Sequence, residues 1–541
     1  MSPGSLHSRP TRRKAPPTVS TSHSARPKTA AVIGAGFAGL ATAALLARDG
    51  IDVTVIERLD TVGGRAGEET FDGFRFDMGP SWYLMPDAFD HFFALFGYRS
   101  EELLDLVPLD PAYRLFPEGQ APVDVPADPA EAAALFESIE PGAGARLAEY
   151  LDSAERTYGL ALRHFLYTTF SSPAAFLTPE VRAGYADLLK FLTTPLDRFV
   201  AHRFRDTRLR QMLTYPAVFL SSHPSKTPAL YHLMSHTDLT QGVRYPLGGF
   251  AAVVSAVERV AREQGVRFRL GTEVSAITYS GSRATGVQVG SEQLLFDAVV
   301  SAADLHHTET RLLPPEKRTY DEPYFASRNP GVSAVLVLCG VRGALPQLDH
   351  HNLLFSHEWA TDFDAVFAGP VRERPLGASQ SIYVSKPSAT DPSTAPEGDE
   401  NLFVLVPVPA SAAVGSGDAY GDGASASVQA IADSAIDQIA RWCDIPDLRE
   451  RIVVQKTVGP ADFAARYHAW SGGAIGPAHT LRQSAFLRGR NASRKLDNLY
   501  YAGATTVPGV GVPMCLISAE NVVKRLHGDR SSGPLPTTPP A

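Results

Sequence analysis

Three glycines near the start of the chain have the spacing of a turn that binds phosphate. Gly34, Gly36 and Gly39 occur in the order GxGxxG. In such a turn the first glycine makes the sharp bend, the second lets a pyrophosphate approach the backbone, and the third lets a helix pack closely on a strand. The spacing therefore indicates dinucleotide binding.

The residues on either side of the turn predict the elements that would position it. An apolar run at 29–33 predicts a buried strand, and the Ala/Leu-rich run after the turn predicts a helix. The amides of Phe37 and Ala38 would face the phosphates, because the N-terminal end of a helix attracts anions. A second strand at 53–56 ends on Glu57, about 20 residues beyond the turn, where a carboxylate accepts hydrogen bonds from a ribose.

The residues after Glu57 indicate which dinucleotide is bound. Arg58 follows directly, and after a gap of four residues come Gly63, Gly64 and Arg65. This arrangement resembles the extended motif of two-dinucleotide-binding-domain flavoproteins, which include amine oxidases and carotenoid desaturases. The resemblance implies FAD rather than NAD as the cofactor, with the two glycines close to it and the second arginine helping to hold it.

Three further segments resemble the parts of carotenoid desaturases that contact the flavin nucleotide. The first would lie beside the isoalloxazine ring, the second would meet the adenine through its backbone, and the third is a glycine loop that leads into a helix. The positive end of that helix would face the pyrimidine edge of the flavin. The residues so implicated are, in the same order, Gly79, Pro80, Ser81 and Trp82; Val274; and Gly503, Val512, Pro513 and Met514.

The segment 228–250 narrows the resemblance to one family. It reads PALYHLMSHTDLTQGVRYPLGGF and is similar to the central block of bacterial phytoene desaturases, in which a helix leads into a GV-aromatic-YP-x-GG turn. Arg244 stands where many relatives have an aromatic residue, and Met514 where some have glycine. The resemblance extends over about residues 29–526.

This resemblance implies an FAD-dependent desaturase that introduces successive double bonds into phytoene or a similar acyclic carotene. A hydride would pass to the flavin while the neighbouring carbon loses a proton, and oxygen or a quinone would reoxidise the flavin. Because a long polyene offers no polar group, an apolar tunnel must orient it. We assign no catalytic base; the only candidate, from its place in the family-like block, is Asp238.

Other activities of the same fold stay open. One is that of a sister carotenoid enzyme, which could be a desaturase of another precursor, an isomerase or a ketolase. A flavin amine oxidase agrees less well with the segment 228–250. A non-catalytic protein, like the lipid-binding escorts of prenylated GTPases, would not need the intact glycine turn.

The expected architecture is α/β: a Rossmann-type, amine-oxidase-like FAD-binding domain, a mixed-sheet substrate domain and a helical, membrane-facing subdomain. The FAD-binding domain would combine three parts of the chain, at 29–86, 232–310 and 481–528. The other parts are a disordered basic tail at 1–28, a mainly helical subdomain at 87–231, a substrate domain at 311–480 and a disordered tail at 529–541.

Composition limits the remaining possibilities. The chain of 541 residues is 44% hydrophobic and 20% charged, as in ordinary globular proteins, and its net charge of -8 argues against nucleic-acid binding. Its three separated cysteines fit a reducing compartment. No apolar run reaches the ~18 residues of a spanning helix, so we expect a cytoplasmic protein bound peripherally to a membrane. The 16 histidines lack metal-site spacing, and we predict surface or loop positions and no metal for them.

Overall fold

The computed structural model describes residues 26–172, 176–367 and 377–537. Residues 1–25 and 538–541 of the predicted tails lie outside this range. Residues 26–28 already belong to the fold, since the backbone N–H of Lys28 donates to Asp297 at 2.8 Å. At the other end Leu535 packs against the core of the cofactor domain.

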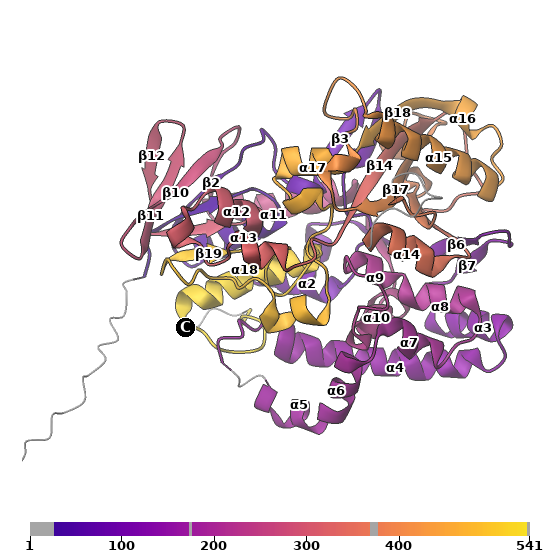
Figure 1. Cartoon of the computed structure of the whole chain (residues 1–541), viewed down its shortest axis with the longest axis horizontal. Helices are drawn as coiled ribbons and strands as arrows, with labels where there is room; N and C mark the ends of the chain where they lie inside the picture. The colour runs from indigo at the N-terminus through magenta and orange to yellow at the C-terminus, as the bar shows by residue number, and fades with distance from the viewer. Residues whose placement is uncertain (1–25, 173–175, 368–376, 538–541) are drawn as a thin grey trace, which may run out of the picture.

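A five-stranded parallel sheet supports the glycine turn. Its strands, in spatial order, are β19 (Leu499–Tyr501), β13 (Ala298–Ser301), β1 (Thr29–Ile33), β2 (Asp52–Ile56) and β9 (Arg267–Arg269). Side chains alternate across β1: Ala30 and Val32 face α1 (Phe37–Arg48), α11 (Gly249–Glu263) and α18 (Val512–His527), whereas Ala31 and Ile33 face the opposite core. That second core includes the antiparallel sheet of β10 (Val274–Ser280), β11 (Arg283–Val289) and β12 (Glu292–Leu295) (Figure 1).

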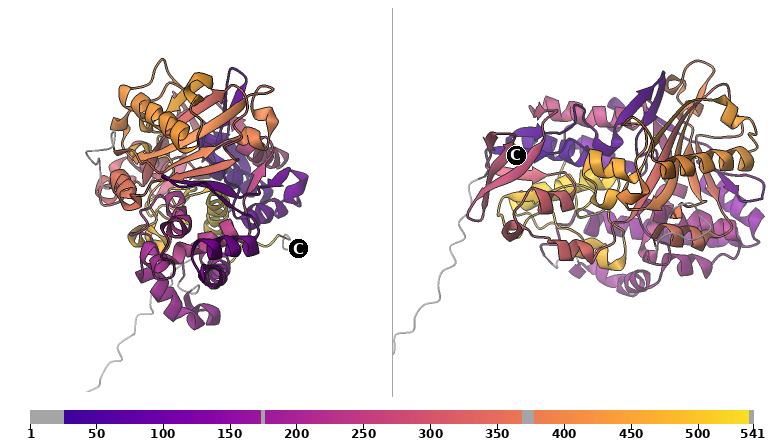
Figure 2. Two further views of the ribbon diagram at one scale, coloured as in Figure 1. Left: turned by 90° about the vertical axis from the view of Figure 1, so that its right-hand side faces the viewer. Right: turned by 45° about the horizontal axis from the view of Figure 1, so that its top comes forward.

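A seven-stranded mixed sheet lies beside the cofactor domain (Figures 1 and 2). Its order is β18 (Ile452–Val458), β14 (Val332–Val341), β17 (Glu400–Pro409), β16 (Ile382–Ser385), β15 (His351–Phe355), β6 (Tyr113–Pro117) and β7 (Val123–Val125). On β14, Val335 and Val337 pack in the core that includes α15 (Ala426–Trp442), whereas Ala334 and Leu336 lie on the other face, in a core with Phe74 and Phe76.

A layer of helices lies beneath this sheet in Figure 1 and in the left view of Figure 2. It consists of α3 (Pro129–Ile139), α4 (Ala143–Ala161), α5 (Pro179–Ala183), α6 (Tyr185–Thr193), α7 (Leu196–Ala201), α8 (Thr207–Thr214), α9 (Pro216–Phe219) and α10 (Met234–Leu239). A π-helical turn at Leu162–Leu166 follows α4. Among the residues that the structure describes, no helix is long and apolar enough to cross a membrane.

The remaining elements connect these layers. They are the hairpin β3 (Glu68–Phe71) and β4 (Phe74–Asp77), the pair β5 (Leu106–Pro108) and β8 (Arg244–Pro246), and the helices α2 (Pro86–Ala94), α12 (Leu305–Arg311), α13 (Glu322–Ala326), α14 (Trp359–Phe367), α16 (Leu448–Arg451) and α17 (Pro460–Tyr467). The predicted α/β class, with a parallel nucleotide-type sheet and a separate mixed sheet, is confirmed.

Candidate functional site

A cavity of about 510 Å³ extends from the glycine turn to the mixed sheet and the helical layer. Its volume is within the range of small-molecule sites. Nearly all predicted site residues line it: Gly34, Gly36, Phe37, Ala38, Glu57, Arg58, Gly63, Gly64, Arg65, Gly79, Pro80, Ser81, Trp82, Val274, Gly503, Val512, Pro513 and Met514. Gly39 and Asp238 do not. The fold thus brings four distant segments together, although the contact of each residue with FAD stays a prediction.

The glycine turn has the shape that its sequence predicts. Gly34 has φ +98°, and its N–H donates to the carbonyl of Ile56 at 2.9 Å. A Cβ on Gly39 would lie 1.9 Å from the carbonyl oxygen of Gly34, so this glycine permits close packing from beneath the turn. A Cβ on Gly36 would meet nothing nearer than 3.9 Å, and no side chain caps α1. Space and free amides therefore remain where a phosphate would bind.

The side chain of Glu57, directly after β2, hydrogen-bonds to the glycine turn. Its carboxylate accepts the backbone N–H of Ala35 at 2.7 Å through Oε2 and that of Leu59 at 2.8 Å through Oε1. The sequence analysis assigns this carboxylate to a ribose and does not foresee the two backbone contacts. A carboxylate has about four acceptor sites, so both functions are compatible.

Arg65 supplies the observation that tests whether the residues fit FAD. Its Nε is buried and has no hydrogen-bond partner among the described residues. A buried unpaired donor of this kind costs about 1–3 kcal/mol, which an anionic group in the cavity would recover. The adjacent Gly63 and Gly64 have φ of +106° and +58°, and a Cβ on Gly64 would lie 3.3 Å from Gly36. The residues therefore fit a pyrophosphate held between two glycine segments.

The opposite half of the cavity is apolar. Its lining includes Phe219, Leu220, Tyr231, Leu233, Met234, Ala334, Leu336, Tyr383, Phe403 and Leu405, none of them charged. Trp82 stands between the two halves and stacks on His351, with ring centroids 4.4 Å apart and 9° between the planes. The hydroxyl of Tyr383 lies 2.7 Å from Nδ1 of the same histidine. These apolar lining residues together with Trp82, called the apolar wall below, suit a substrate bound by the hydrophobic effect.

Asp238 lies behind this wall. It is buried, and its Oδ2 accepts the hydroxyl of Tyr215 at 2.8 Å. Burial raises the pKa of the Asp238 carboxyl to about 7. Tyr215 in turn packs against Trp82 and Phe219, both of which line the cavity. The carboxyl therefore supports the wall through a tyrosine and does not face the cavity. Of the two departures from the family pattern, Met514 lines the cavity and Arg244 does not.

The prediction of surface or loop histidines is wrong at several positions. His351 is buried on β15, and His232 and His236 are buried in the helical segments Ala229–Leu233 and Met234–Leu239. His350 and His479 lie in loops, as predicted, but both are buried, and His479, 3% exposed, lines the cavity. The pair His350 and His351 could have been suspected from the apolar run that follows it on β15. His479 gave no such signal, because its neighbours in space come from distant segments. No group of three or more His, Cys, Asp or Glu side chains that could hold a metal occurs in the described part of the chain.

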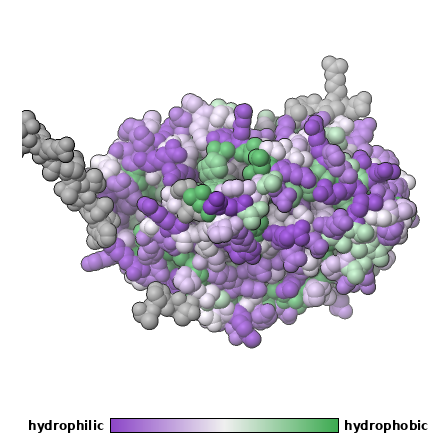
Figure 3. All heavy atoms as spheres, turned by 90° about the horizontal axis from the view of Figure 1, so that it is seen from below, coloured by the Kyte–Doolittle hydropathy of each residue, from purple (hydrophilic) through white to green (hydrophobic). Residues whose placement is uncertain are grey.

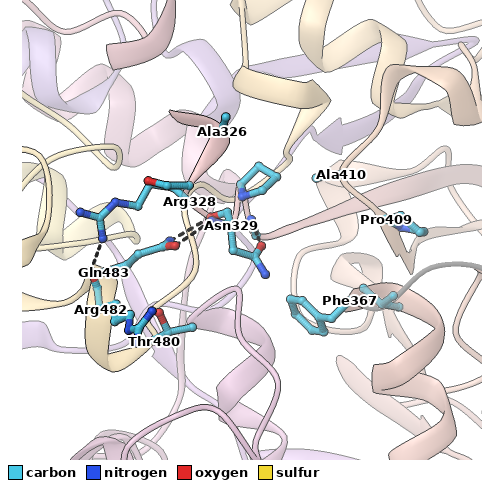
Figure 4. A pocket seen from close by; sticks show the side chains of 13 residues that line it. Ala326, Arg328, Asn329, Phe367, Pro409, Ala410, Thr480, Arg482 and Gln483 are labelled. Atoms are coloured by element: carbon cyan, nitrogen blue, oxygen red, sulfur yellow. Dashed lines mark hydrogen bonds between the residues drawn. The ribbon is translucent and has the colours of Figure 1, made fainter. Parts of the chain in front are cut away.

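A second hollow lies between α13, α14 and residues 480–483 (Figure 4). It is polar, with Arg328 and Arg482 among its lining residues, and it contains none of the predicted site residues. The side chain of Gln483 donates to the carbonyl of Asn329 at 2.9 Å across it.

Comparison with known proteins agrees with this geometry. The model of the family described as flavin containing amine oxidoreductase matches residues 37–527. The chain is 41% identical over 498 residues to the carotenoid 3,4-desaturase of Haloarcula japonica, covering 92% of this chain and 98% of that protein. It is 33% identical over 512 residues to the zeta-carotene-forming phytoene desaturase of Myxococcus xanthus, covering 92% and 93%.

Solved structures share the fold at low sequence identity. An oxidoreductase from Methanosarcina mazei aligns with a TM-score of 0.57 at 17% identity, covering 92% of this chain and 100% of that one. Putrescine oxidase bound to putrescine aligns with a TM-score of 0.57 at 15% identity, covering 93% and 99%. The predicted amine-oxidase-like fold and the predicted flavin cofactor are confirmed.

Proposed function

Because the chain belongs to the family of flavin-containing amine oxidoreductases, we propose that it is an FAD-dependent carotenoid desaturase acting on an acyclic carotene. The observation that carries this proposal is that the segments 219–234, 334–336 and 403–405 and Tyr383 contribute only uncharged residues to the described cavity lining. An amine substrate would need a polar or anionic partner there, whereas a polyene needs none. The two carotenoid desaturases that match over nearly the whole chain support the same assignment.

The cofactor would be held by backbone groups and one cation. When bound, FAD would supply the acceptor for a hydride from a saturated carbon, which is the oxidising half of desaturation. The amides that begin α1 and the guanidinium of Arg65 would bind the pyrophosphate, and the backbone of Val274 would meet the adenine. The uncapped start of α18 presents a positive helix end to the cavity. The apolar wall orients the polyene and excludes water.

The bond that is oxidised could be the 3,4 bond, the one in the name of the relative with 41% identity. Phytoene desaturation is the other candidate, from the second relative. Expression in two host strains, one accumulating phytoene and one a fully desaturated acyclic carotene, separates them. We expect a red shift of the extracted pigment in one strain. Unchanged pigment in both, with FAD bound to the protein, would overturn the proposal.

We further propose that the enzyme draws its substrate from a membrane surface. Large apolar side chains are exposed just before α5, on α6 and in the adjoining segment 481–487, namely Leu177, Tyr185, Leu189, Leu481, Phe486 and Leu487. The Phe486 ring contacts Phe170 and Phe176, and nearby Leu166 lines the cavity. Figure 3 views the face toward which the helical layer lies and shows hydrophobic patches among hydrophilic side chains. Such a surface suits the interfacial region of a bilayer.

Vesicle sedimentation tests this surface. Leu177→Glu combined with Leu189→Glu should release the protein from vesicles, whereas Leu295→Glu, at a 71% exposed position on β12, should not. Equal release of both variants would contradict the proposed surface. The oxidant that regenerates FAD, oxygen or a quinone, follows from comparing turnover in air with anaerobic turnover in the presence of quinone.

A further inference from the structure

His479 is the one imidazole on the cavity lining, within the described residues, that lies away from the adenosine end. The other two, His307 and His468, stack on each other near Arg58, and His468 lies 3.2 Å from the carboxylate of Glu273, next to Val274. Nδ1 of His479 is 3.1 Å from the carbonyl oxygen of Leu220, and its backbone N–H donates to the same oxygen at 3.2 Å. Because a carbonyl can only accept, Nδ1 carries the proton and Nε2 is left as a bare acceptor.

The bare nitrogen lies against the loop that leads into α18. A Cβ on Gly509 would be 2.3 Å from Nε2, so the absence of a side chain there makes room for the ring. This loop begins at Gly503 and reaches α18 at the expected flavin ring, and Leu220 and Tyr231 lie on the apolar side. His479 therefore stands where the cofactor half of the cavity meets the substrate half.

The surroundings keep this imidazole neutral. Burial and then the positive charge of Arg488 lower the pKa of His479 well below its usual value, against the opposing effect of the Leu220 carbonyl. The other titratable group that packs on the ring is the phenol of Tyr231, 5.5 Å away between centroids. Arg488 is itself buried and donates to the carbonyls of Ala504 at 2.6 Å and Thr506 at 3.0 Å. Arg488 thereby connects the segment that contains His479 to the loop between Gly503 and α18.

We propose that Nε2 of His479 accepts the proton that the substrate loses during desaturation. The inference rests on the proposed desaturase function. The C–H bond next to the carbon that gives up a hydride breaks, its electron pair becomes the new carbon–carbon π bond, and the proton bonds to Nε2. The hydride and its two electrons go to the flavin. A weak base suffices, because loss of the hydride makes the neighbouring proton strongly acidic.

Asp238 and His351, two other buried polar groups near the apolar side, do not offer this geometry. Asp238 is separated from the cavity by Tyr215 and the aromatic wall. His351 contacts the cavity only through Tyr383 and Trp82 and is not part of the lining. Unlike these two groups, His479 combines a fixed tautomer, an acceptor nitrogen without a protein donor among the described residues and a place on the lining.

The test uses the FAD-loaded protein, mixed without oxygen with the carotene that the wild-type enzyme converts. His479→Asn keeps a donor for the Leu220 carbonyl but has no Nε2. We expect flavin reduction in this variant to slow by about 10²–10⁴-fold, the usual contribution of a positioned base, at unchanged FAD content. The control His306→Asn alters a partly exposed histidine on α12 outside the cavity and should reduce flavin at the wild-type rate. Wild-type reduction by His479→Asn would overturn the proposal.

Two readouts separate proton transfer from a structural effect. The wild-type rate should fall on the acidic side, below the usual histidine pKa of about 6.5, and His479→Asn should lose this dependence. Added imidazole should restore reduction in His479→Ala, and failure of this rescue in FAD-loaded protein would contradict the assignment. If no carotene reduces the wild-type flavin, the proposed function itself fails, a result distinct from a variant that reacts normally.

Discussion

The two halves of the cavity are built in different ways. The cofactor half is built around glycines, and most of its residues come from the segment between Gly34 and Trp82. The apolar half is made of side chains that reach it from α9, α10, β14, β16 and β17. A backbone site depends on a few glycines that cannot be replaced, whereas a side-chain wall can change its shape by substitution. The first half therefore sets the chemistry and the second sets the substrate.

The largest effect on FAD binding and stability is expected at Gly39, where the backbone of α1 packs directly against the backbone of the glycine turn. Gly39→Val would place a Cβ 1.9 Å from the carbonyl oxygen of Gly34, in the fully buried part of α1. We expect a protein that retains no FAD and unfolds at lower temperature, measured by flavin absorbance and thermal denaturation. Gly421→Val is the control, because nothing lies within 4 Å of its Cβ position. Normal FAD content in Gly39→Val would show that the turn tolerates displacement.

A smaller loss of FAD affinity should follow from removing the guanidinium of Arg65. Arg65→Met deletes a guanidinium whose buried Nε lacks a protein partner. Hydrogen bonds to charged groups are worth about 1.5–3 kcal/mol, so FAD affinity should fall about 10–150-fold. Fluorescence titration of the apoprotein with FAD measures this. The control Arg269→Met removes an exposed arginine paired with Glu292 and should bind as tightly as the wild type.

These two positions are predicted in different ways, Gly39 from the spacing of the glycine turn and Arg65 from a family resemblance. The glycine turn and its flanking strands are local, so the spacing at residues 29–57 predicts their geometry, whereas the segments 63–65, 79–82 and 503–514 and Val274 are implied only by the resemblance. The two backbone contacts of Glu57 and the position of His479 could not be predicted, because each depends on how separate segments meet. β6 and β7 illustrate the same limit: they lie within a mainly helical stretch and join the mixed sheet only through pairing of β6 with β15.

A substitution in the apolar half should change the reaction with the carotene and leave FAD affinity unchanged. Ala334→Phe would extend a ring from β14 into the cavity that Ala334 lines. A mismatch of this kind in an apolar pocket costs about 1–3 kcal/mol, so reduction of the flavin by carotene should slow about 10–200-fold. FAD affinity should stay within twofold of wild type. A parallel loss of FAD would show that the two halves are not independent.

The smallest effect on the reaction is expected at Asp238, behind the wall. Asp238→Asn should leave flavin reduction unchanged, because the carboxyl does not reach the cavity. Its effect should appear in stability instead. Burial raises the pKa of this carboxyl from 3.8 to about 7, so between these values the folded protein holds a proton that the unfolded chain has lost. Stability contributed by this group therefore decreases as pH rises through that window.

Asparagine cannot ionise, and the variant should lack this decrease. A shift of three pKa units corresponds to about 4 kcal/mol, an upper value from which the weakened contact with Tyr215 must be subtracted. Denaturant unfolding at pH 5 and pH 8 should therefore show that the free energy of unfolding of the variant, relative to that of the wild type, is higher at pH 8 than at pH 5. If the variant instead lost stability equally at both values and also slowed flavin reduction, Asp238 would act on the substrate half directly, and the wall could not be treated as a passive support.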